Sequence, residues 1–499
     1  MPADLPDLLA RRAALTPDRI AIEETASARR LSYAGLDRLA WGMADMLGRA
    51  GVAPGDRVAV ACRNGASFFS LLFACARTGA ILVPLNWRLA GVELAAIIAD
   101  ADPRLIVTDR HFAPLAREAA PSLPVLALDD AREIDPPRRP APTWPGDRIW
   151  SLLYTSGTTG RPKGVIQTFG MALANHVNVR EGIDLRGEDR FLCLLPNFHT
   201  AGINLYALPV LFSGGCVLLP PEFDAGATLK AIGVGEVTMM FAVPTIYQRM
   251  ADHPAFSTTD LSAIRHWGSG GASLPASLIA TYAERGVLLC NGMGMTETGP
   301  TALVMDRDAV ITRPRSIGRP QFLVEAIVAD DHGPVPDGEA GEIRFRGPAI
   351  TPGYWRNPQA TREAFDADGW LRSGDIGRRD ANGYFEIVGR SKDMFISGGE
   401  NVYPAEVEAV LLTHPCMREA AVIGVDDRDW GESGHAFVVV MGDVRAADLV
   451  AHCRASLAGY KVPRGFTFVE SLPRTVTGKV RKHELVVPSD SVAALATTG

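Results

Sequence analysis

The sequence predicts an α/β protein with a large N-terminal domain of layered α/β subdomains and a small C-terminal α+β domain. In the first part of the chain, segments with a helical period alternate with short apolar runs typical of buried strands. This alternation favours largely parallel sheets covered by helices. Toward the C-terminus, short strands bounded by Gly and Asp replace that pattern. The length of 499 residues also exceeds what one hydrophobic core usually holds, so two or more folded units are expected.

The elements of the first part follow from apolar spacing. Residues 32–50 place Leu36, Leu39 and Met43 on one helical face, and Ser32 is a suitable N-cap. The neighbouring segments alternate in type. We expect strands over residues 57–62, 80–84, 105–108 and 125–128 and a helix over residues 68–78.

The second part begins after an exposed connector. Residues 135–145 contain five prolines, which disfavour regular structure, and a strand over residues 150–154 should follow. We place the domain boundary near residues 389–392, so the N-terminal domain would span residues 1–390 and the C-terminal domain residues 391–499. The late elements are strands over residues 342–346, 384–388 and 421–424 and a helix over residues 404–412.

Composition excludes several classes of protein. A net charge of −7 and a pI of about 5.9 argue against nucleic acid as a partner, because phosphate contacts need a basic surface. The seven cysteines form no CxxC pair, so neither a disulfide framework nor a zinc site is indicated. The N-terminus lacks the apolar core of a signal peptide, and no 18-residue apolar run predicts a membrane span. We therefore expect a soluble cytoplasmic protein.

The most informative loop is residues 154–165, YTSGTTGRPKGV. Glycines allow backbone N–H groups to approach an anion closely, and Ser and Thr hydroxyls add further donors. Lys163 supplies a point charge suited to a polyphosphate. Pro162 and Gly164 break the match to a Walker A loop. A flexible surface loop of turn formers is the alternative interpretation, and this combination of residues favours phosphate binding over it.

That loop resembles the phosphate-binding signature of the adenylate-forming superfamily, which includes acyl- and aryl-CoA synthetases, luciferases and the adenylation domains of peptide synthetases. Five further motifs resemble the family in its order and extend the resemblance over almost the whole chain. They are NGMGMTET at residues 291–298, GWLRSGD at 369–375, YFEIVGRSKD at 384–393, GGENVYP at 398–404 and PRTVTGK at 473–479. The chain is most similar to acyl- or aryl-CoA synthetases, and we expect the same division into a large domain and a mobile small one.

The resemblance implies a two-step reaction. A carboxylic acid would attack ATP to give an acyl-adenylate and pyrophosphate, and the thiol of coenzyme A would then take the acyl group and release AMP. ATP, Mg²⁺ and coenzyme A are the implied cofactors, and a small-molecule carboxylic acid is the implied partner. The alternative acceptor is a carrier protein supplied in trans, because only a short segment follows Lys479. A luciferase-like oxygenase and a non-catalytic nucleotide-binding regulator have no positive sign in the sequence.

The resemblance also assigns catalytic roles. Thr296 would contact the α-phosphate, and Glu297 would bind Mg²⁺ together with Thr159. Lys479 would bridge the attacking carboxylate and the α-phosphate, where charge neutralisation matters most. His199, in the segment Pro196–His199, would lie beside the carboxylate, and Lys392 would be the hinge about which the small domain rotates.

The remaining residues implied by the resemblance bind the nucleotide or line the path of the thiol. Asp375 would accept hydrogen bonds from the ribose with help from Arg390, and Gly398 and Gly399 would line the thiol's path. The full set is Thr155, Ser156, Gly157, Thr158, Thr159, Lys163, Gly270, Gly271, Ala272, Asn291, Gly292, Met293, Gly294, Met295, Asp375, Arg390, Gly398 and Gly399.

The acyl pocket is the least specified part of the sequence. The segment FHTAGINLY, residues 198–206, offers no acidic residue to pair with an amino group, which favours an acid without an α-ammonium group. Asn291 lacks the positive charge expected for a dicarboxylate. Met293 stands where the family usually has an aromatic residue against adenine, and methionine is polarizable enough to cover a purine face. The sequence does not name the acid.

Overall fold

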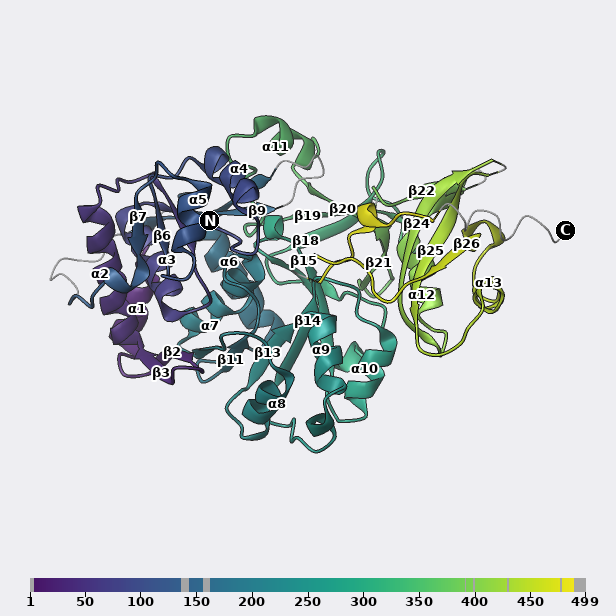
Figure 1. Cartoon of the computed structure of the whole chain (residues 1–499), viewed down its shortest axis with the longest axis horizontal. Coiled ribbons are helices and arrows are strands. Elements are labelled where there is room, and N and C mark those ends of the chain that lie inside the picture. The colour runs from purple at the N-terminus through teal and green to yellow at the C-terminus, as the bar shows by residue number, and fades with distance from the viewer. Residues whose placement is uncertain are drawn as a thin grey trace.

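The structure is a computed structural model that describes residues 4–135, 143–155, 162–390, 392–397, 400–428, 430–475 and 478–488. A large N-terminal part and a small C-terminal part lie at opposite ends of the long axis (Figure 1). The predicted α/β fold class, with a large and a small unit, is confirmed. The boundary after residue 390 stays a prediction, since residue 391 lies outside the described residues.

One sheet of the large part has six strands in the order β10-β9-β5-β4-β6-β7. All neighbours are parallel except β10, which runs antiparallel to β9. The strands predicted before the proline-rich connector all lie in this sheet. Its members are β4 (Arg57–Ala61), β5 (Ile81–Pro84), β6 (Leu105–Thr108), β7 (Val125–Ala127), β9 (Ile149–Thr155) and β10 (Lys163–Thr168).

A second sheet has nine strands in the order β17-β16-β15-β14-β13-β11-β12-β2-β3. The six strands from β15 to β2 are parallel to one another. At one end β3 pairs antiparallel with β2, and at the other β16 pairs antiparallel with β15 and β17 with β16. The members are β2 (Ile20–Glu24), β3 (Arg29–Ser32), β11 (Arg190–Cys193), β12 (Cys216–Leu219), β13 (Met239–Ala242), β14 (His266–Gly270), β15 (Leu289–Gly294), β16 (Thr301–Val304) and β17 (Arg319–Pro320).

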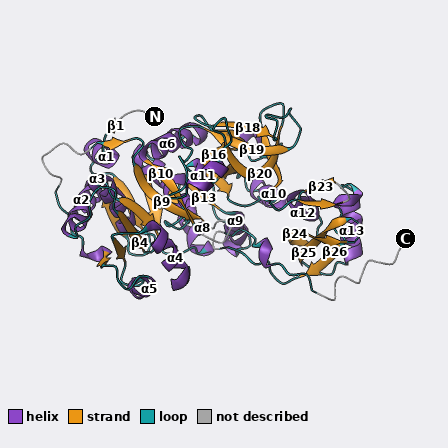
Figure 2. Ribbon diagram, turned by 90° about the horizontal axis from the view of Figure 1, so that it is seen from above, coloured by secondary structure: helices purple, strands orange, loops and turns teal. Residues whose placement is uncertain are grey.

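Helices pack against and between these sheets (Figure 2). The largest apolar cluster joins Phe69 and Phe169 on helices to Val58 and Phe191 on strands of the two different sheets. As predicted, Ser32 caps the helix that follows it, because its side chain accepts a hydrogen bond from the Gly35 N–H. The helices of the large part are α1 (Leu8–Leu15), α2 (Tyr33–Arg49), α3 (Ala66–Thr78), α4 (Gly91–Ala101), α5 (Ala113–Ala119), α6 (Phe169–Ile183), α7 (Ala207–Ser213), α8 (Ala225–Gly233), α9 (Pro244–Ala251), α10 (Ala276–Ala283) and α11 (Pro358–Ala364).

Two short pieces complete the large part. The pair β1 (Asp4–Leu5) and β8 (Trp144–Pro145) joins the chain's beginning to the residues after the proline-rich connector, most of which lies outside the described residues. A four-stranded antiparallel sheet then leads to the small part. Its strands are β18 (Glu325–Ala329), β19 (Gly341–Arg346), β20 (Leu371–Arg379) and β21 (Phe385–Arg390).

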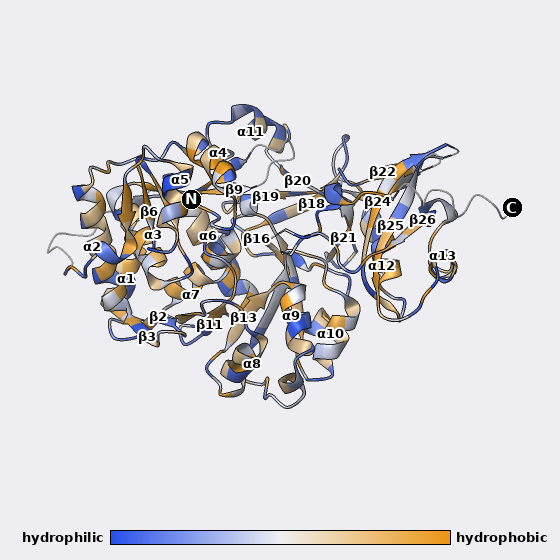
Figure 3. Ribbon diagram, viewed as in Figure 1, coloured by the Kyte–Doolittle hydropathy of each residue, from blue (hydrophilic) through white to orange (hydrophobic). Residues whose placement is uncertain are grey.

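The small part has an apolar core of its own, which includes Phe395, Val407 and Leu449. Apolar residues concentrate along its strands as they do in the large part (Figure 3). In the portion of the chain that the structure describes, no helix is both long and apolar enough to cross a bilayer. The elements are β22 (Phe395–Ser397), β23 (Glu400–Val402), β24 (Met417–Asp427), β25 (Gly431–Val440), β26 (Gly465–Phe468), α12 (Pro404–Leu411) and α13 (Ala446–Arg454).

A buried ion cluster joins three elements near the N-terminus. The Arg77 guanidinium on α3 donates to Asp7 Oδ2 at 2.8 Å and to the Asp37 carboxylate on α2. The same guanidinium stacks 4.5 Å from the Trp41 ring. Asp7 also caps α1 by accepting from the Ala10 N–H at 2.9 Å. One cation thus holds two buried carboxylates, and losing it would leave both charges uncompensated.

We expect Arg77→Ala to lower the free energy of unfolding by about 3–5 kcal/mol, the usual cost of breaking a buried ion pair by removing one partner. Chemical denaturation followed by far-ultraviolet circular dichroism measures this. Arg445→Ala is the matched control, because the Arg445–Asp448 pair is exposed, and it should leave the unfolding midpoint unchanged. Equal effects of the two substitutions would contradict the role given to Arg77.

Candidate functional site

The candidate site lies beyond the carboxyl ends of neighbouring parallel strands, where open α/β sheets commonly bind ligands. β14 ends at Gly270, and β15 contains Asn291 and ends at Gly294. Gly271 follows β14 with φ +79°, a left-handed conformation that favours glycine. Two groups of residues that the sequence analysis assigned to the nucleotide, 270–272 and 291–295, therefore meet at this edge of the sheet.

Thr296 and Glu297 follow β15 in a single 3₁₀ turn, and both are buried. Glu297 Oε1 accepts a hydrogen bond from the Tyr354 hydroxyl at 2.9 Å. Burial raises the pKa of Glu297, while hydrogen bonds and the positive charges of Lys479 and Lys163 oppose that shift. The buried Glu297 carboxylate is suited to binding a cation, and the two lysines near it are suited to binding a polyphosphate.

β10, which follows the glycine-rich loop in the chain, contacts the 3₁₀ turn that holds Thr296 and Glu297. Thr155 pairs with Lys163 across the hairpin, so these two residues close the loop between them. The Lys163 Nζ lies 5.3 Å from the centre of the Tyr354 ring. The loop members Ser156, Gly157, Thr158 and Thr159 lie outside the described residues, and their phosphate contacts stay predictions.

Asp375 and Arg390 lie opposite each other on β20 and β21. The Arg390 Nε donates to Asp375 Oδ1 at 2.8 Å, and Asp375 is only 6% exposed. Burial raises the pKa of Asp375, and the charges of Arg390 and Lys479 oppose the rise. The structure therefore brings together the two residues that the sequence analysis assigned to the ribose.

Lys479 reaches this site from the small part of the chain. Burial and the neighbouring Arg390 lower the pKa of Lys479, whereas Asp375 and Glu297 raise it. Lys479 is exposed, and it lies close enough to Arg390, Asp375 and Glu297 for their charges to act on its ammonium group. The yellow C-terminal segment extends from the small part onto the large one (Figure 1).

The contact between the two parts is close at the residue before Lys479. A Cβ added to Gly478 would lie 3.5 Å from Thr245 Oγ1 and 3.9 Å from Val243 Cγ2, at the start of α9. Gly478 has φ +84°, which favours glycine at this point of approach. The segment carrying Lys479 is therefore packed against the end of β13, beside the strands that form the site.

His199 lies near the same lysine. Burial, with a smaller effect of the Lys479 charge, lowers the pKa of His199 to about 4. Its Nδ1 accepts a hydrogen bond from the Ala201 N–H at 3.2 Å, and a π-helical turn, residues 201–205, follows. His199 is therefore neutral near pH 7 and offers a dipole rather than a charge.

Two features of the site lie outside the sequence motifs: Tyr354, and a buried polar chain that links both sides of the site. The Gln167 Nε2 donates to the Thr296 carbonyl at 2.9 Å, and Asn204 Nδ2 donates to Gln167 Oε1 at 3.3 Å. Asn204 Nδ2 also donates to Thr200 Oγ1 at 3.2 Å, next to His199. Gln167 and Thr296 are 129 residues apart and Asn204 and Gln167 are 37 apart, so no local motif could have revealed these two contacts, whereas Asn204 and Thr200 are 4 residues apart.

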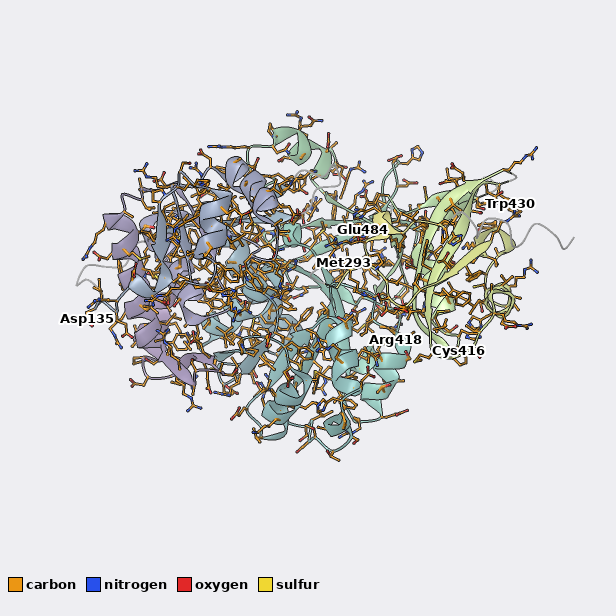
Figure 4. All side chains as sticks on the ribbon, in the orientation of Figure 1. Asp135, Met293, Cys416, Arg418, Trp430 and Glu484 are labelled. Atoms are coloured by element: carbon orange, nitrogen blue, oxygen red, sulfur yellow. The ribbon has the colours of Figure 1, made fainter. Side chains whose placement is uncertain are left out.

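Other predicted residues have less defined surroundings. Met293, labelled in Figure 4, is 8% exposed. It belongs to an apolar cluster with Phe345 and Phe385. Lys392 is exposed between β21 and β22. Gly398 and Gly399 lie outside the described residues. The adenine contact of Met293, the hinge role of Lys392 and the thiol path past the two glycines stay predictions.

Two family models match the chain. The model described as AMP-binding enzyme matches residues 9–355, and the model described as AMP-binding enzyme C-terminal domain matches residues 406–479. A feruloyl-CoA synthase of Amycolatopsis is 44% identical over 482 residues, which cover 95% of this chain and 97% of that protein. The long-chain-fatty-acid–CoA ligase FadD13 of Mycobacterium tuberculosis is 36% identical over 96% of this chain and 97% of its own.

Solved structures agree with these matches. The o-succinylbenzoate CoA synthetase of Bacillus subtilis, in complex with its acyl-adenylate intermediate, superimposes with a TM-score of 0.88. It is 32% identical to the chain, and the alignment covers 97% of this chain and 98% of that one. The same enzyme has been solved with ATP and a magnesium ion, again with a TM-score of 0.88, 32% identity and coverage of 97% and 100%.

We expect Tyr354→Phe to lower kcat/KM for ATP, because the substitution removes a hydrogen bond to the buried Glu297 carboxylate. Hydrogen bonds to charged groups contribute about 1.5–3 kcal/mol, so the loss should be roughly 10–150-fold. The rate of pyrophosphate release in the presence of the carboxylic acid substrate, at varied Mg²⁺ concentrations, measures this loss. The control is Tyr384→Phe, which removes a similar hydrogen bond to Asp306, 2.7 Å long, in a different cluster. A normal kcat/KM for ATP in Tyr354→Phe would show that the hydrogen bond from Tyr354 to Glu297 does not contribute to the reaction.

Proposed function

The chain belongs to the AMP-binding enzyme family and is an ATP-dependent acyl- or aryl-CoA synthetase, and we propose that its acid is an aromatic monocarboxylic acid of the hydroxycinnamate class. Of the relatives reported above, the feruloyl-CoA synthase is more similar to this chain than the fatty-acid ligase. The observation that carries the proposal is an uncharged aromatic wall on one face of β14.

That wall forms because glycines allow a ring to lie against the strand. A Cβ at Gly268 would lie 2.9 Å from Phe241 Cδ2, and a Cβ at Gly270 would lie 3.2 Å from Phe241 Cζ. The Phe241 ring is partly exposed and meets the Tyr206 ring edge-on at 5.7 Å between centres. Planar rings pack well against such surfaces, since aromatic pairs gain from stacked and edge-on contacts.

The polar groups of the wall carry no charge. The Tyr206 hydroxyl lies 2.9 Å from His266 Nε2, and both residues are buried. Burial lowers the pKa of His266 to about 3, so the imidazole is neutral near pH 7. Tyr206, Phe241 and His266, the described residues of this wall, carry no positive charge near pH 7, which supports a monocarboxylic substrate. It does offer hydrogen-bonding capacity near a ring, which suits a phenolic acid.

In the first half-reaction a carboxylate oxygen of the acid forms a bond to the α-phosphorus of ATP. The bond from that phosphorus to the bridging oxygen breaks, and pyrophosphate leaves with the electron pair. Lys479 would offset the repulsion between the two anions, and Thr296 would hold the α-phosphate. Such preorganised charge is most effective in a site of low water content. His199 stays neutral and would orient the carboxylate.

The residues present also fit Mg²⁺. Glu297 supplies a carboxylate oxygen, the ligand type that Mg²⁺ prefers. No group of three or more His, Cys, Asp or Glu residues that could hold a metal occurs among the residues that the structure describes. This suits an ion held by one or two protein oxygens and by substrate phosphates, where it would neutralise phosphate charge.

In the second half-reaction the sulfur of coenzyme A forms a bond to the acyl carbonyl carbon and its thiol proton passes to solvent. The bond from that carbon to the phosphate oxygen breaks, and AMP leaves with the electron pair. We place the hinge for this step at Lys392, with Gly398 and Gly399 along the path of the thiol. Rotation there would remove Lys479 from the site once the adenylate has formed. A carrier protein as acceptor has no support among the relatives reported above.

We expect Lys479→Ala to reduce adenylate formation about 10²–10³-fold, the usual effect of losing one charged contact to a transition state. ATP–pyrophosphate exchange measures this step. Thiolysis of supplied acyl-adenylate should remain measurable, because Lys479 acts only on the first half-reaction. Equal loss in both half-reactions would count against this role.

A substrate screen tests the acid. Pyrophosphate release should favour hydroxycinnamates over long-chain and dicarboxylic acids by about 10–200-fold in kcat/KM, the range that hydrophobic pocket contacts provide. Gly268→Ala should reduce this preference by displacing the Phe241 ring, while the KM for ATP stays within about twofold. A preference for long-chain acids in the unaltered protein would overturn the proposal.

A further inference from the structure

The residues around Lys479 form a small hairpin. Arg474 and Val480 make an isolated antiparallel bridge, and the Thr475 N–H donates to the Lys479 carbonyl at 2.7 Å. The Gly478 N–H donates to the Thr475 carbonyl at 2.9 Å, and the Lys479 N–H donates to Thr475 Oγ1 at 3.1 Å. Backbone contacts therefore set the fold of the hairpin but leave open how it is fixed to the small domain.

The Arg474 side chain connects the hairpin to the sheet beneath it. Its Nη1 donates to the Gly478 carbonyl at 2.5 Å, and its Nη2 donates to Glu419 Oε2 at 2.6 Å. Glu419 belongs to β24 of the small domain. The guanidinium group is planar, so one rigid fork joins the carboxylate on the sheet to the peptide that precedes Lys479.

We propose that Arg474, anchored by Glu419, is the positioning residue for Lys479 in adenylate formation. It fixes the Gly478–Lys479 peptide relative to β24, so that the flexible lysine stem starts from a defined place and direction. The inference rests on the role of Lys479 proposed above and adds to it the groups that hold the lysine in place.

Arg474 positions Lys479 rather than stabilising the fold. Val480 and Leu472 pack in an apolar cluster of the small domain, and the Arg481 N–H donates to the Pro473 carbonyl at 2.8 Å. These anchors keep the hairpin in place without Arg474. Misplacing a catalytic group by about 1 Å is enough to cost roughly 10²-fold in rate. Loss of the two Arg474 hydrogen bonds therefore affects the position of Lys479 more than the stability of the protein.

The chain offers a matched control pair. Lys482 Nζ lies 2.7 Å from Glu408 Oε1, and the side chains are 21% and 18% exposed. For Arg474 and Glu419 the exposed fractions are 29% and 28%. Both pairs join the same C-terminal segment to the small domain, but Lys482 follows Lys479 and no hydrogen bond described for it reaches the Gly478–Lys479 peptide. Both pairs are partly exposed, so we expect removal of Arg474 or of Lys482 to have a modest structural cost, and without Lys482 the Glu408 carboxylate still accepts from the Val422 N–H at 2.7 Å.

The experiment compares Arg474→Met and Lys482→Met in the full-length protein. ATP–pyrophosphate exchange, thiolysis of supplied acyl-adenylate and the melting temperature are measured for each. Arg474→Met should lower kcat for exchange about 10–100-fold and leave KM for ATP within about threefold, because position and not binding is lost. Its thiolysis rate and melting temperature should match those of Lys482→Met.

Two conservative variants test whether both hydrogen bonds of Arg474 are needed. Arg474→Lys should restore part of the exchange activity, since an ammonium group reaches one acceptor but does not span both. Glu419→Gln should reduce exchange less than Arg474→Met, because the amide keeps an acceptor oxygen without the charge. Full activity in Arg474→Met, or an equal fall in both half-reactions, would overturn the inference.

The Lys479→Ala variant separates this inference from the proposal on which it rests. If Lys479→Ala retains exchange, the proposed role of Lys479 fails. If Lys479→Ala loses exchange while Arg474→Met keeps it, only the positioning role of Arg474 fails.

Discussion

A lysine carried by the small domain lies within the electrostatic reach of two carboxylates and an arginine that belong to the large one. The reaction brings a carboxylate to a polyphosphate, so positive charge has to be supplied where two anions meet. In the role proposed for it, Lys479 would supply this charge while the two parts lie as they do here. The close approach of Gly478 to Val243 and Thr245 would then matter to the chemistry, as the charged groups do.

Burial makes these charges effective. Glu297 and Asp375 are almost fully enclosed, and burial raises the pKa of each carboxyl group. Each is stabilised as a charged group by a directed partner, Tyr354 for Glu297 and Arg390 for Asp375. The same low exposure strengthens the field that a bound nucleotide would meet. The site thus combines its charges with hydrogen bonds that hold them in position.

Much of this could be predicted from local sequence. Alternating apolar segments identified five strands of the six-stranded sheet, all but β10, and the helix capped by Ser32, because periodicity is a short-range property. Short motifs identified Glu297, Asp375, Arg390 and Lys479, which the structure brings close enough for the charges of the first three to act on the lysine. The contacts of Tyr354 and Gln167 were not predicted, since their partners are 57 and 129 residues away in the chain.

The sequence by itself determined the α/β class, the family resemblance and the chemical identity of the charged groups, because each depends on a few neighbouring residues. Only the tertiary structure decided which of those groups meet and in what surroundings. Whether His199 is charged depends on burial and on a lysine 280 positions away, and whether Lys479 is well placed depends on the fork from Arg474 to Glu419. Burial and long-range contact are properties of the folded chain, which no local pattern encodes.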